Sequence, residues 1–337
     1  MARCFLATVC LLSLLEMVSS FTMHRKDNVA VYWGQKSSIS LADACDNDNY
    51  NMIIMGFVTN YNTSVPNSLV LNLAGNCGEG MSPCSDLAKD ITTCQSKGKA
   101  VTLSLGGGSL PPWEMITLNS DQEAKDFGNM MYNTFLGGSV DDPKRPFGSA
   151  VLDGFDLDIE QGSTDHFDVF IQTVRDASTQ NHDSRWYYFT AAPQCPQLTG
   201  QPYGNLFSTT PFDALFVQFY NNDCGLDAWP ESPWNFDAWN NWAENDAPNN
   251  GSVKVYIGAP AASGPGMAHY VDAQKLGDII LDTVRKYGSF GGVMLWDIYA
   301  AKSNDNFDAA VKKDLNESMI PKIGHLRRSV NVGDLLP

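Results

Sequence analysis

Eight short apolar runs recur along this chain of 337 residues, and no other feature limits its possible folds as much. Each run is bounded by Gly, Pro, Asn or Ser, as is typical of strands that are buried on both faces. In order, the runs are Asn28–Trp33, Met52–Thr59, Ala100–Leu105, Leu152–Glu160, Tyr187–Ala192, Ala214–Tyr220, Val253–Gly258 and Gly292–Trp296.

Segments with helical spacing separate several of these runs. In one of them Phe167, Phe170, Ile171 and Val174 stand at i, i+3, i+4 and i+7, which is one helix face. Strands alternating with helices indicate a parallel sheet, and eight such units indicate closure into a TIM (β/α)8 barrel. The alternative, an open doubly wound sheet, would need a topological switch point, and we find no Gly-rich phosphate turn opening a helix. The expected helices are Ser85–Ser96, Asp121–Phe135, Asp165–Ala177, Asp272–Tyr287 and Asp305–Leu315.

The two ends of the chain differ from the middle. Residues 1–20 combine Arg3, an apolar run and small residues before Phe21, which predicts a secretory signal peptide, and the run is too short to span a bilayer. We expect residues 21–318 to form a single barrel and the polar residues 319–337 to form a tail. The strongest candidate insertion, residues 223–251, contains four Trp and a helical pattern at Phe236–Ala243.

The charge of the chain limits its partners. The formal net charge is −16 and the pI is about 4.5. Because affinity for phosphate needs clustered Lys and Arg, we expect no nucleic acid and no membrane surface as a partner. We expect a secreted, extracellular monomer, and Asn62, Asn250 and Asn316 begin possible glycosylation sequences.

Six cysteines remain after Cys4 and Cys10 leave with the signal, and an even number in an oxidising compartment predicts disulfides. Cys77 and Cys84 bracket a short loop and are expected to pair locally. Cys195 and Cys224 each follow a predicted strand by a few residues, which would place them at the same end of the sheet. Cys45 is then left with Cys94.

The stretch Val151–Glu160 carries three carboxylates with the period of a strand. Successive side chains of a strand point to opposite faces, so Asp156, Asp158 and Glu160 share one face. An antiparallel strand with one solvated face would explain such a pattern without any function. In a closed barrel, however, this face points into the interior, where unpaired charge is costly.

Polar and aromatic residues gather where the predicted strands end, which is where reactive groups lie in such barrels. Together with Glu160, these residues suit a neutral polyhydroxy ligand, since sugars offer flat C–H faces to aromatic rings and hydroxyls to amides. An aromatic residue considered alone is more often part of the hydrophobic core than of a binding site. The strand-end residues are Tyr32, Trp33, Phe57, Gly106–Gly108, Ala192–Gln194, Gln218–Asn222 and Trp296.

Other chemistries find less support. The five histidines are scattered without ligand spacing, so we expect neither a metal nor another cofactor, although a cation held by Asp156 and Asp158 alone stays open. Serine hydrolysis lacks a nucleophile elbow, and a cysteine nucleophile is disfavoured if all six mature cysteines are bridged.

The acidic stretch, Asp153-Gly154-Phe-Asp156-Leu-Asp158-Ile-Glu160, resembles the DxxDxDxE signature of glycoside hydrolase family 18. Five further blocks, in the right order, are similar to the class III (hevamine-like) chitinases of plants and fungi, and the likeness covers nearly the whole mature chain. These blocks are Val31–Gln35, Leu103–Gly108, Ala192–Pro196, Val217–Asn222 and Gly291–Trp296. The resemblance implies a TIM barrel with the disulfides Cys45–Cys94, Cys77–Cys84 and Cys195–Cys224.

The resemblance also implies an activity, the retaining endo-hydrolysis of β-1,4-linked N-acetylglucosamine. Glu160 would be the general acid, and the substrate's own acetamide oxygen would attack the anomeric carbon. Asp158 would hold the acetamide N–H, Tyr220 would bond the acetamide oxygen, and Asp156 would share a proton with Asp158. The implied sugar-binding residues are Tyr32, Gly107, Gln218, Asn221 and Trp296, with Asp153 and Gly154 in structural roles.

Two further expectations concern charge and backbone. Three carboxylates on an interior face cannot all ionise cheaply, so we expect a raised pKa for Glu160 and an acidic pH optimum, with Asp156 able to hold the shared proton. The family likeness also predicts cis peptide bonds at Gly56-Phe57 and Trp296-Asp297, although Gly56 and Asp297 depart from its more frequent Ala and Ser.

Two rival functions stay open. One is a non-catalytic carbohydrate-binding or inhibitor relative on the same barrel, in which case the Trp-rich residues 223–251 could narrow the groove. The other is an endo-β-N-acetylglucosaminidase that acts on N-glycans. Glu160, Asp158 and Tyr220 are all present, which favours the enzyme over the binder.

Overall fold

The structure, a computed structural model, describes residues 21–36, 38–61, 69–77, 84–108 and 115–320. The predicted signal peptide, the glycosylation sequence at Asn62 and nearly all of the predicted tail lie outside the described residues.

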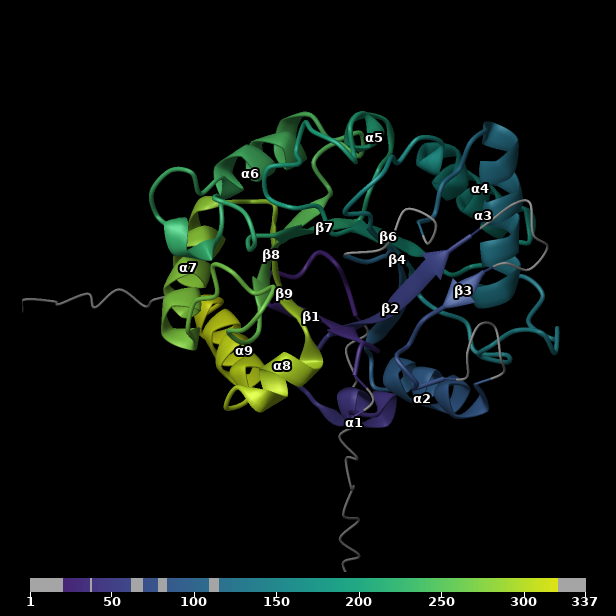
Figure 1. Ribbon diagram of the computed structural model, residues 1–337, viewed down its shortest axis with the longest axis horizontal. Helices are drawn as coiled ribbons and strands as arrows, with labels where there is room; N and C mark the ends of the chain where they lie inside the picture. The colour runs from purple at the N-terminus through teal and green to yellow at the C-terminus, as the bar shows by residue number, and fades with distance from the viewer. Residues whose placement is uncertain (1–20, 37, 62–68, 78–83, 109–114, 321–337) are drawn as a thin grey trace, which may run out of the picture.

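Eight parallel strands close into a barrel, as the eight apolar runs predict (Figure 1). The ring runs β1-β2-β4-β5-β6-β7-β8-β9, and pairing of β1 with both β2 and β9 closes it. A two-residue strand, β3 (Val70–Leu71), lies antiparallel on β2 outside the ring. The barrel strands are β1 (Asn28–Trp33), β2 (Met52–Asn60), β4 (Ala100–Gly106), β5 (Gly154–Asp158), β6 (Tyr188–Ala191), β7 (Ala214–Gln218), β8 (Lys254–Pro260) and β9 (Phe290–Trp296).

Helices surround the barrel, and the predicted ones are present within two or three residues at their ends (Figure 1). These are α2 (Ser85–Ser96), α3 (Asp121–Phe135), α4 (Phe167–Gln180), α6 (Phe236–Asn245), α7 (Ala273–Lys286) and α9 (Phe307–Ser318). The periodicity did not predict the short helices α1 (Leu41–Asp46), α5 (Leu206–Thr209) and α8 (Ile298–Ser303). Caps mark two of them: Ser40 and Asp43 form a capping box on α1, and the Asp297 side chain accepts from Ala300 N on α8.

Both faces of the barrel strands are buried, which explains why the strands read as apolar runs. The outward-facing side chains pack under the helices; Phe155 of β5, for example, lies 6.1 Å from Phe170 of α4 between ring centroids. The inward-facing side chains form a second cluster that includes Tyr32, Phe57 and Met294. Met23, which precedes β1, belongs to the same cluster, and its sulfur lies 3.3 Å from the Tyr256 hydroxyl.

Strand β5 ends earlier than the sequence pattern predicts, at Asp158 instead of Glu160. The phenol of Tyr203 bonds the backbone of β5 at this point, next to the sheet bond from Ala192 N to Leu157 O at 2.9 Å. Its Oη donates to Leu157 O at 2.6 Å and accepts from Ile159 N at 3.1 Å. The side-chain alternation nevertheless continues through Glu160, which therefore stands just above the end of the strand.

Three disulfides join Cys45 to Cys94, Cys77 to Cys84 and Cys195 to Cys224, which confirms the predicted pairing. Both predicted non-proline peptide bonds, Gly56-Phe57 and Trp296-Asp297, are cis.

The Trp-rich residues 223–251 pack outside the barrel. The Trp239 indole donates to Cys195 O at 3.1 Å, and Trp234 lies 4.4 Å from Phe219 between ring centroids. None of these residues lines the cleft described below.

Candidate active site

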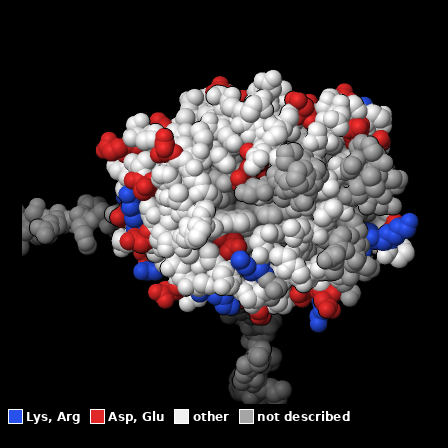
Figure 2. All heavy atoms as spheres, in the orientation of Figure 1, with Lys and Arg blue, Asp and Glu red and all other residues white. Residues whose placement is uncertain are grey.

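A cleft of about 970 Å³, open to solvent, lies over the carboxyl ends of the barrel strands, and Figure 2 shows this face hollowed near its centre. Six of the predicted site residues line it together with Glu160: Tyr32, Gly107, Asp158, Tyr220, Asn221 and Trp296. The sequence analysis did not single out Gln35, Thr59, Asn72, Pro265, Gly266 and Met267, which complete the walls.

Asp156 lies below the cleft and is fully buried. Three hydroxyl groups from other strands of the barrel surround its carboxyl. Ser104 of β4 and Thr190 of β6 are its partners in the strand register. Ser104 Oγ donates to Oδ2 at 2.6 Å, Tyr32 Oη donates to the same oxygen at 2.7 Å, and Thr190 Oγ1 donates to Oδ1 at 2.7 Å. Three donors favour the ionised form of this carboxyl.

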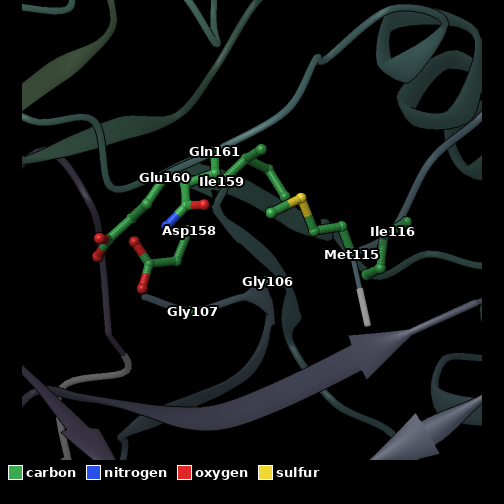
Figure 3. A pocket seen from close by; sticks show the side chains of 8 residues that line it. All are labelled: Gly106, Gly107, Met115, Ile116, Asp158, Ile159, Glu160 and Gln161. Carbon is green, nitrogen blue, oxygen red and sulfur yellow. The ribbon is translucent and has the colours of Figure 1, made fainter. Parts of the chain in front are cut away.

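Asp158 and Glu160 stand above Asp156, and one amide joins them. Gln218 Nε2 donates to Asp158 Oδ1 at 3.0 Å and lies 3.3 Å from Glu160 Oε1, while a further bond to Ala192 O at 2.9 Å fixes the amide. Figure 3 shows the carboxyl groups of Asp158 and Glu160 side by side, pointing away from Met115 and Ile116. Gln218 itself lies behind the two carboxyls and does not line the cleft.

Burial raises the pKa of all three carboxyls. It raises the pKa of Asp158 well above its ordinary value, and the charges of Glu160 and Asp156 raise it further. The pKa of Glu160 also rises through burial, although the amides of Gln218 and Gln194 oppose the rise. For Asp156, burial raises the pKa while its three hydroxyl donors oppose the rise. Asp158 is thus the carboxyl whose pKa is raised both by burial and by the charges of its neighbours.

A second amide chain reaches the outer oxygen of Glu160. Gln194 Nε2 lies 3.5 Å from Glu160 Oε2, and Asn222 Nδ2 donates to Gln194 Oε1 at 3.1 Å. Because Asn222 occupies the carbonyl end of the Gln194 side chain, the amino end of that side chain faces Glu160.

Aromatic rings form the floor of the cleft. Trp296 lies 5.3 Å from Tyr32 and 6.0 Å from Phe57 between ring centroids, nearly parallel to the latter. Tyr220 is 6% exposed, and burial raises the pKa of its phenol well above the ordinary value, with Asp158 and Glu160 adding to the rise. This phenol makes no hydrogen bond to another described residue, and it lines the cleft as a neutral group.

At two glycines of the predicted motifs, a larger residue would collide with neighbouring atoms. Gly154 has φ +147°, and a Cβ there would lie 2.0 Å from Tyr188 O of the next strand. Gly107 has φ +101°, and a Cβ there would lie 3.1 Å from the Phe57 ring. Asp153 joins β5 to neighbouring segments, because its Oδ2 accepts from Val101 N of β4 at 2.7 Å and from Gln95 Nε2 of α2 at 3.0 Å.

Asn221 is placed differently from the other predicted sugar-binding residues. Although it lines the cleft, both polar ends of its side chain are hydrogen-bonded to the loop after β8, at Gly266 and Ala268.

Within the described ranges, no group of three or more His, Cys, Asp or Glu side chains is arranged to hold a metal ion. Over the same ranges, none of the helices has the length and apolar character that crossing a membrane requires.

Comparison with known proteins places these features in a family. The profile of the glycosyl hydrolases family 18 matches residues 28–268. Chitinase 2 of Candida albicans is 36% identical over 320 residues, covering 91% of this chain and 51% of its own length. Acidic endochitinase SE2 of Beta vulgaris is 34% identical over 319 residues, covering 94% of this chain and 100% of its own. The chain thus spans about half the length of several fungal relatives and the whole of a plant one.

Solved structures share the fold. A chitinase of Ipomoea carnea superposes with a TM-score of 0.73 at 32% identity, covering 85% of this chain and 99% of its own. A xylanase and α-amylase inhibitor of Scadoxus multiflorus superposes with a TM-score of 0.70 at 30% identity, covering 84% and 97%. The same barrel therefore occurs in structures named as an enzyme and as an inhibitor.

Proposed function

Because the chain belongs to glycosyl hydrolase family 18, we propose that it is an endochitinase that cleaves β-1,4-linked N-acetylglucosamine chains with retention of configuration. The observation that carries the proposal is the pair of carboxyls of Asp158 and Glu160, which line the cleft and share one Gln218 amide. Chitinases among the relatives, from plants and fungi, support the substrate class.

Glu160 is the general acid in this proposal. Its carboxyl lines the cleft, and burial raises its pKa, so that it keeps a proton at mildly acidic pH. It gives this proton to the glycosidic oxygen as the bond to the leaving sugar breaks.

The substrate supplies its own nucleophile. In this proposal no second carboxylate attacks the sugar, because burial and the charges of Glu160 and Asp156 raise the pKa of Asp158 and so disfavour its ionised, nucleophilic form. The acetamide oxygen of the bound sugar attacks the anomeric carbon as the bond to the leaving oxygen breaks, and an oxazolinium ion forms. Asp158 accepts a hydrogen bond from the acetamide N–H, and the negative charge of Asp156 below it offsets the positive charge that develops. Tyr220, whose neutral phenol faces the cleft, donates to the acetamide oxygen and aligns it for attack.

Water then opens the oxazolinium ion from the face that the leaving sugar has vacated. Glu160, now ionised, accepts a proton from that water, which restores the acid and gives a product with the original anomeric configuration.

The remaining site residues bind the sugar or support the reacting groups. Trp296 offers a flat face under the sugar that is cleaved, beside Tyr32 and Phe57. Asp156, held by three hydroxyls, supplies fixed negative charge below Asp158 and keeps the shared proton on it.

The setting of the proposed enzyme is extracellular. The three disulfides are consistent with an oxidising compartment. We propose residues 1–20 as a secretion signal, residues 21–318 as the catalytic barrel and residues 319–337 as a tail, with the enzyme acting as a monomer on chitin or its oligosaccharides.

The rival with support of its own is a non-catalytic binding protein, because the inhibitor named above shares the barrel. The experiment that separates the two measures the release of soluble oligosaccharides from colloidal chitin by the purified protein and by Glu160→Gln. An endochitinase releases oligomers and loses at least about 99% of that activity in the variant, as expected when a general acid worth 10²–10⁴ in rate is removed.

The controls for this experiment are binding and glycan cleavage. Glu160→Gln should still bind colloidal chitin in a pull-down, since Gln keeps the shape of the side chain. Binding without any release by the wild-type chain would establish the binder. Cleavage of an N-glycan but not of colloidal chitin would establish the endo-β-N-acetylglucosaminidase.

A further inference from the structure

The loop that follows β8 forms one wall of the cleft. Pro265, Gly266 and Met267 line it, on the side of Asn221 and Tyr220. Pro265 is exposed and Met267 is half-buried, so this wall presents apolar surface. Other lining residues are polar: Gln35 follows β1, Thr59 lies near the end of β2 and Asn72 follows β3.

Asn221 fastens this loop to the end of β7 through three hydrogen bonds. Its Nδ2 donates to Gly266 O at 2.9 Å, its Oδ1 accepts from Ala268 N at 3.0 Å, and its backbone N donates to Ala268 O at 3.2 Å. The side chain thus pairs with the loop backbone as a neighbouring strand would. Its own backbone has φ +59°, a conformation that Asn tolerates better than most residues.

Other contacts hold the far end of the same loop. His269 Nδ1 lies 2.6 Å from Asp227 Oδ1, and a Cβ at Gly225 would come within 2.4 Å of His269 Cβ, so the loop packs closely there. The Tyr270 hydroxyl accepts from Asn304 Nδ2 at 2.9 Å. Among the hydrogen bonds that join this loop to other parts of the described chain, those of Asn221 reach Gly266 and Ala268, in the stretch that faces the cleft.

We propose that Asn221 is a positioning residue that holds Pro265 and Met267 as an apolar wall, against which a sugar ring next to the one over Trp296 packs. The choice of a sugar as ligand rests on the proposed function. The C–H face of a pyranose matches an apolar wall, and the flexible thioether of Met267 can follow its contour. Since its amide is already committed to the loop, Asn221 acts on the ligand through Met267 and Pro265.

The test measures binding instead of turnover. Titration calorimetry in a Glu160→Gln background compares the N-acetylglucosamine hexamer with the dimer. Met267→Ala should weaken hexamer binding about fivefold through lost apolar contact, while Met267→Leu, which keeps the volume, should stay within about twofold.

Asn221→Gly removes the fastening but keeps the backbone conformation, because Gly adopts positive φ without strain. This variant should also bind the hexamer about fivefold more weakly. Its affinity for the dimer should stay within about twofold of the unchanged value if the dimer is held mainly over Trp296. The matched control is Asn306→Gly, which makes the same change at an exposed residue with φ +55° and no capping hydrogen bond, and it should change neither affinity.

The inference would be overturned if Asn221→Gly bound the hexamer with the same affinity as Asn306→Gly. It would also be overturned if Met267→Ala and Met267→Leu bound the hexamer with equal affinity. This second comparison decides the matter if the Asn221 variant does not fold. A wild-type chain that binds the hexamer but hydrolyses nothing would defeat the proposed function and leave these comparisons intact. If the hexamer does not bind at all, both the ligand class and the wall are wrong.

Discussion

Gly154 opens the strand that carries the acidic residues, and replacing it with Ala should destabilise the fold strongly. The backbone there has φ +147°, a region that only Gly occupies readily and that strains other residues by about 1–3 kcal/mol. A Cβ would lie 2.0 Å from Tyr188 O and 2.6 Å from Tyr188 N, both in the backbone of β6. Backbone atoms cannot rotate away as a side-chain end can, so β5 and β6 must separate.

Separation of these strands would break the bond from Tyr188 N to Asp153 O, now 2.8 Å long. An unpaired buried backbone group costs about 1–3 kcal/mol, so strain and lost bonding together predict a loss of at least about 3 kcal/mol. The assay is equilibrium unfolding in urea with the disulfides intact, followed by tryptophan fluorescence.

Gly75→Ala is the control for this prediction. Gly75 also has a positive φ, +85°, but a Cβ there meets nothing within 4 Å. The free energy of unfolding of Gly75→Ala should therefore fall only by the cost of a positive φ in a residue with a Cβ, about 1–2 kcal/mol. If Gly154→Ala lost no more stability than Gly75→Ala, the steric reason given for the glycine in the motif would be refuted.

Three further predictions concern charge and covalent bonds. Gln194→Met removes an amide donor that lowers the pKa of Glu160, so the alkaline limb of the pH profile of kcat/KM should move upward; a downward shift would show that the amide does not act on the ionised acid. For Asp158 the folded-state pKa is raised, so the folded state loses stability as pH rises from the ordinary value of the carboxyl toward the raised one. Asp158→Asn should therefore be more stable than the wild-type chain at pH 7 in urea unfolding, and the gap should shrink on acidification; a constant gap would contradict the shift. Replacing both cysteines of a pair by Ser should cost about 4 kcal/mol for Cys45–Cys94 and about 2.5 kcal/mol for Cys77–Cys84, because the longer loop constrains the unfolded chain more, and the reverse order would speak against that entropic reason.

Much of the fold follows from local pattern. Strands covered on both faces must be apolar along their length, so each one appears in the sequence as a run between turn residues. The long amphipathic helices are visible for the same reason. The short helices α1, α5 and α8 are not, because six residues or fewer carry too little periodicity.

The acidic face of β5 was also predictable, since alternation fixes which side chains share a face. Its partners were not. Ser104 and Thr190 meet Asp156 only through the register between strands, which no single stretch of sequence contains. A hydroxyl in an otherwise apolar run was the one available signal.

Residues that act through loops were the hardest to place. Tyr203 bonds the backbone at the end of β5 from a segment 44 residues beyond Ile159 in the chain, and Asn221 binds a loop that follows the next strand. Gln218 and Asn221 both stand near the end of β7, yet one supports the carboxyls and the other supports the cleft wall. Residue type and strand-end position could not distinguish these roles, because hydrogen-bond partners come from distant segments.

The central claim is that the anomeric carbon is attacked twice in succession, first while Glu160 provides the proton and then by water, instead of once by water directly. Proton NMR of the products formed in the first minutes of hydrolysis of the N-acetylglucosamine hexamer tests it most directly. The account predicts new reducing ends that are initially all β, which then mutarotate. New ends that appear initially as α would mean direct inversion by water and would contradict the account.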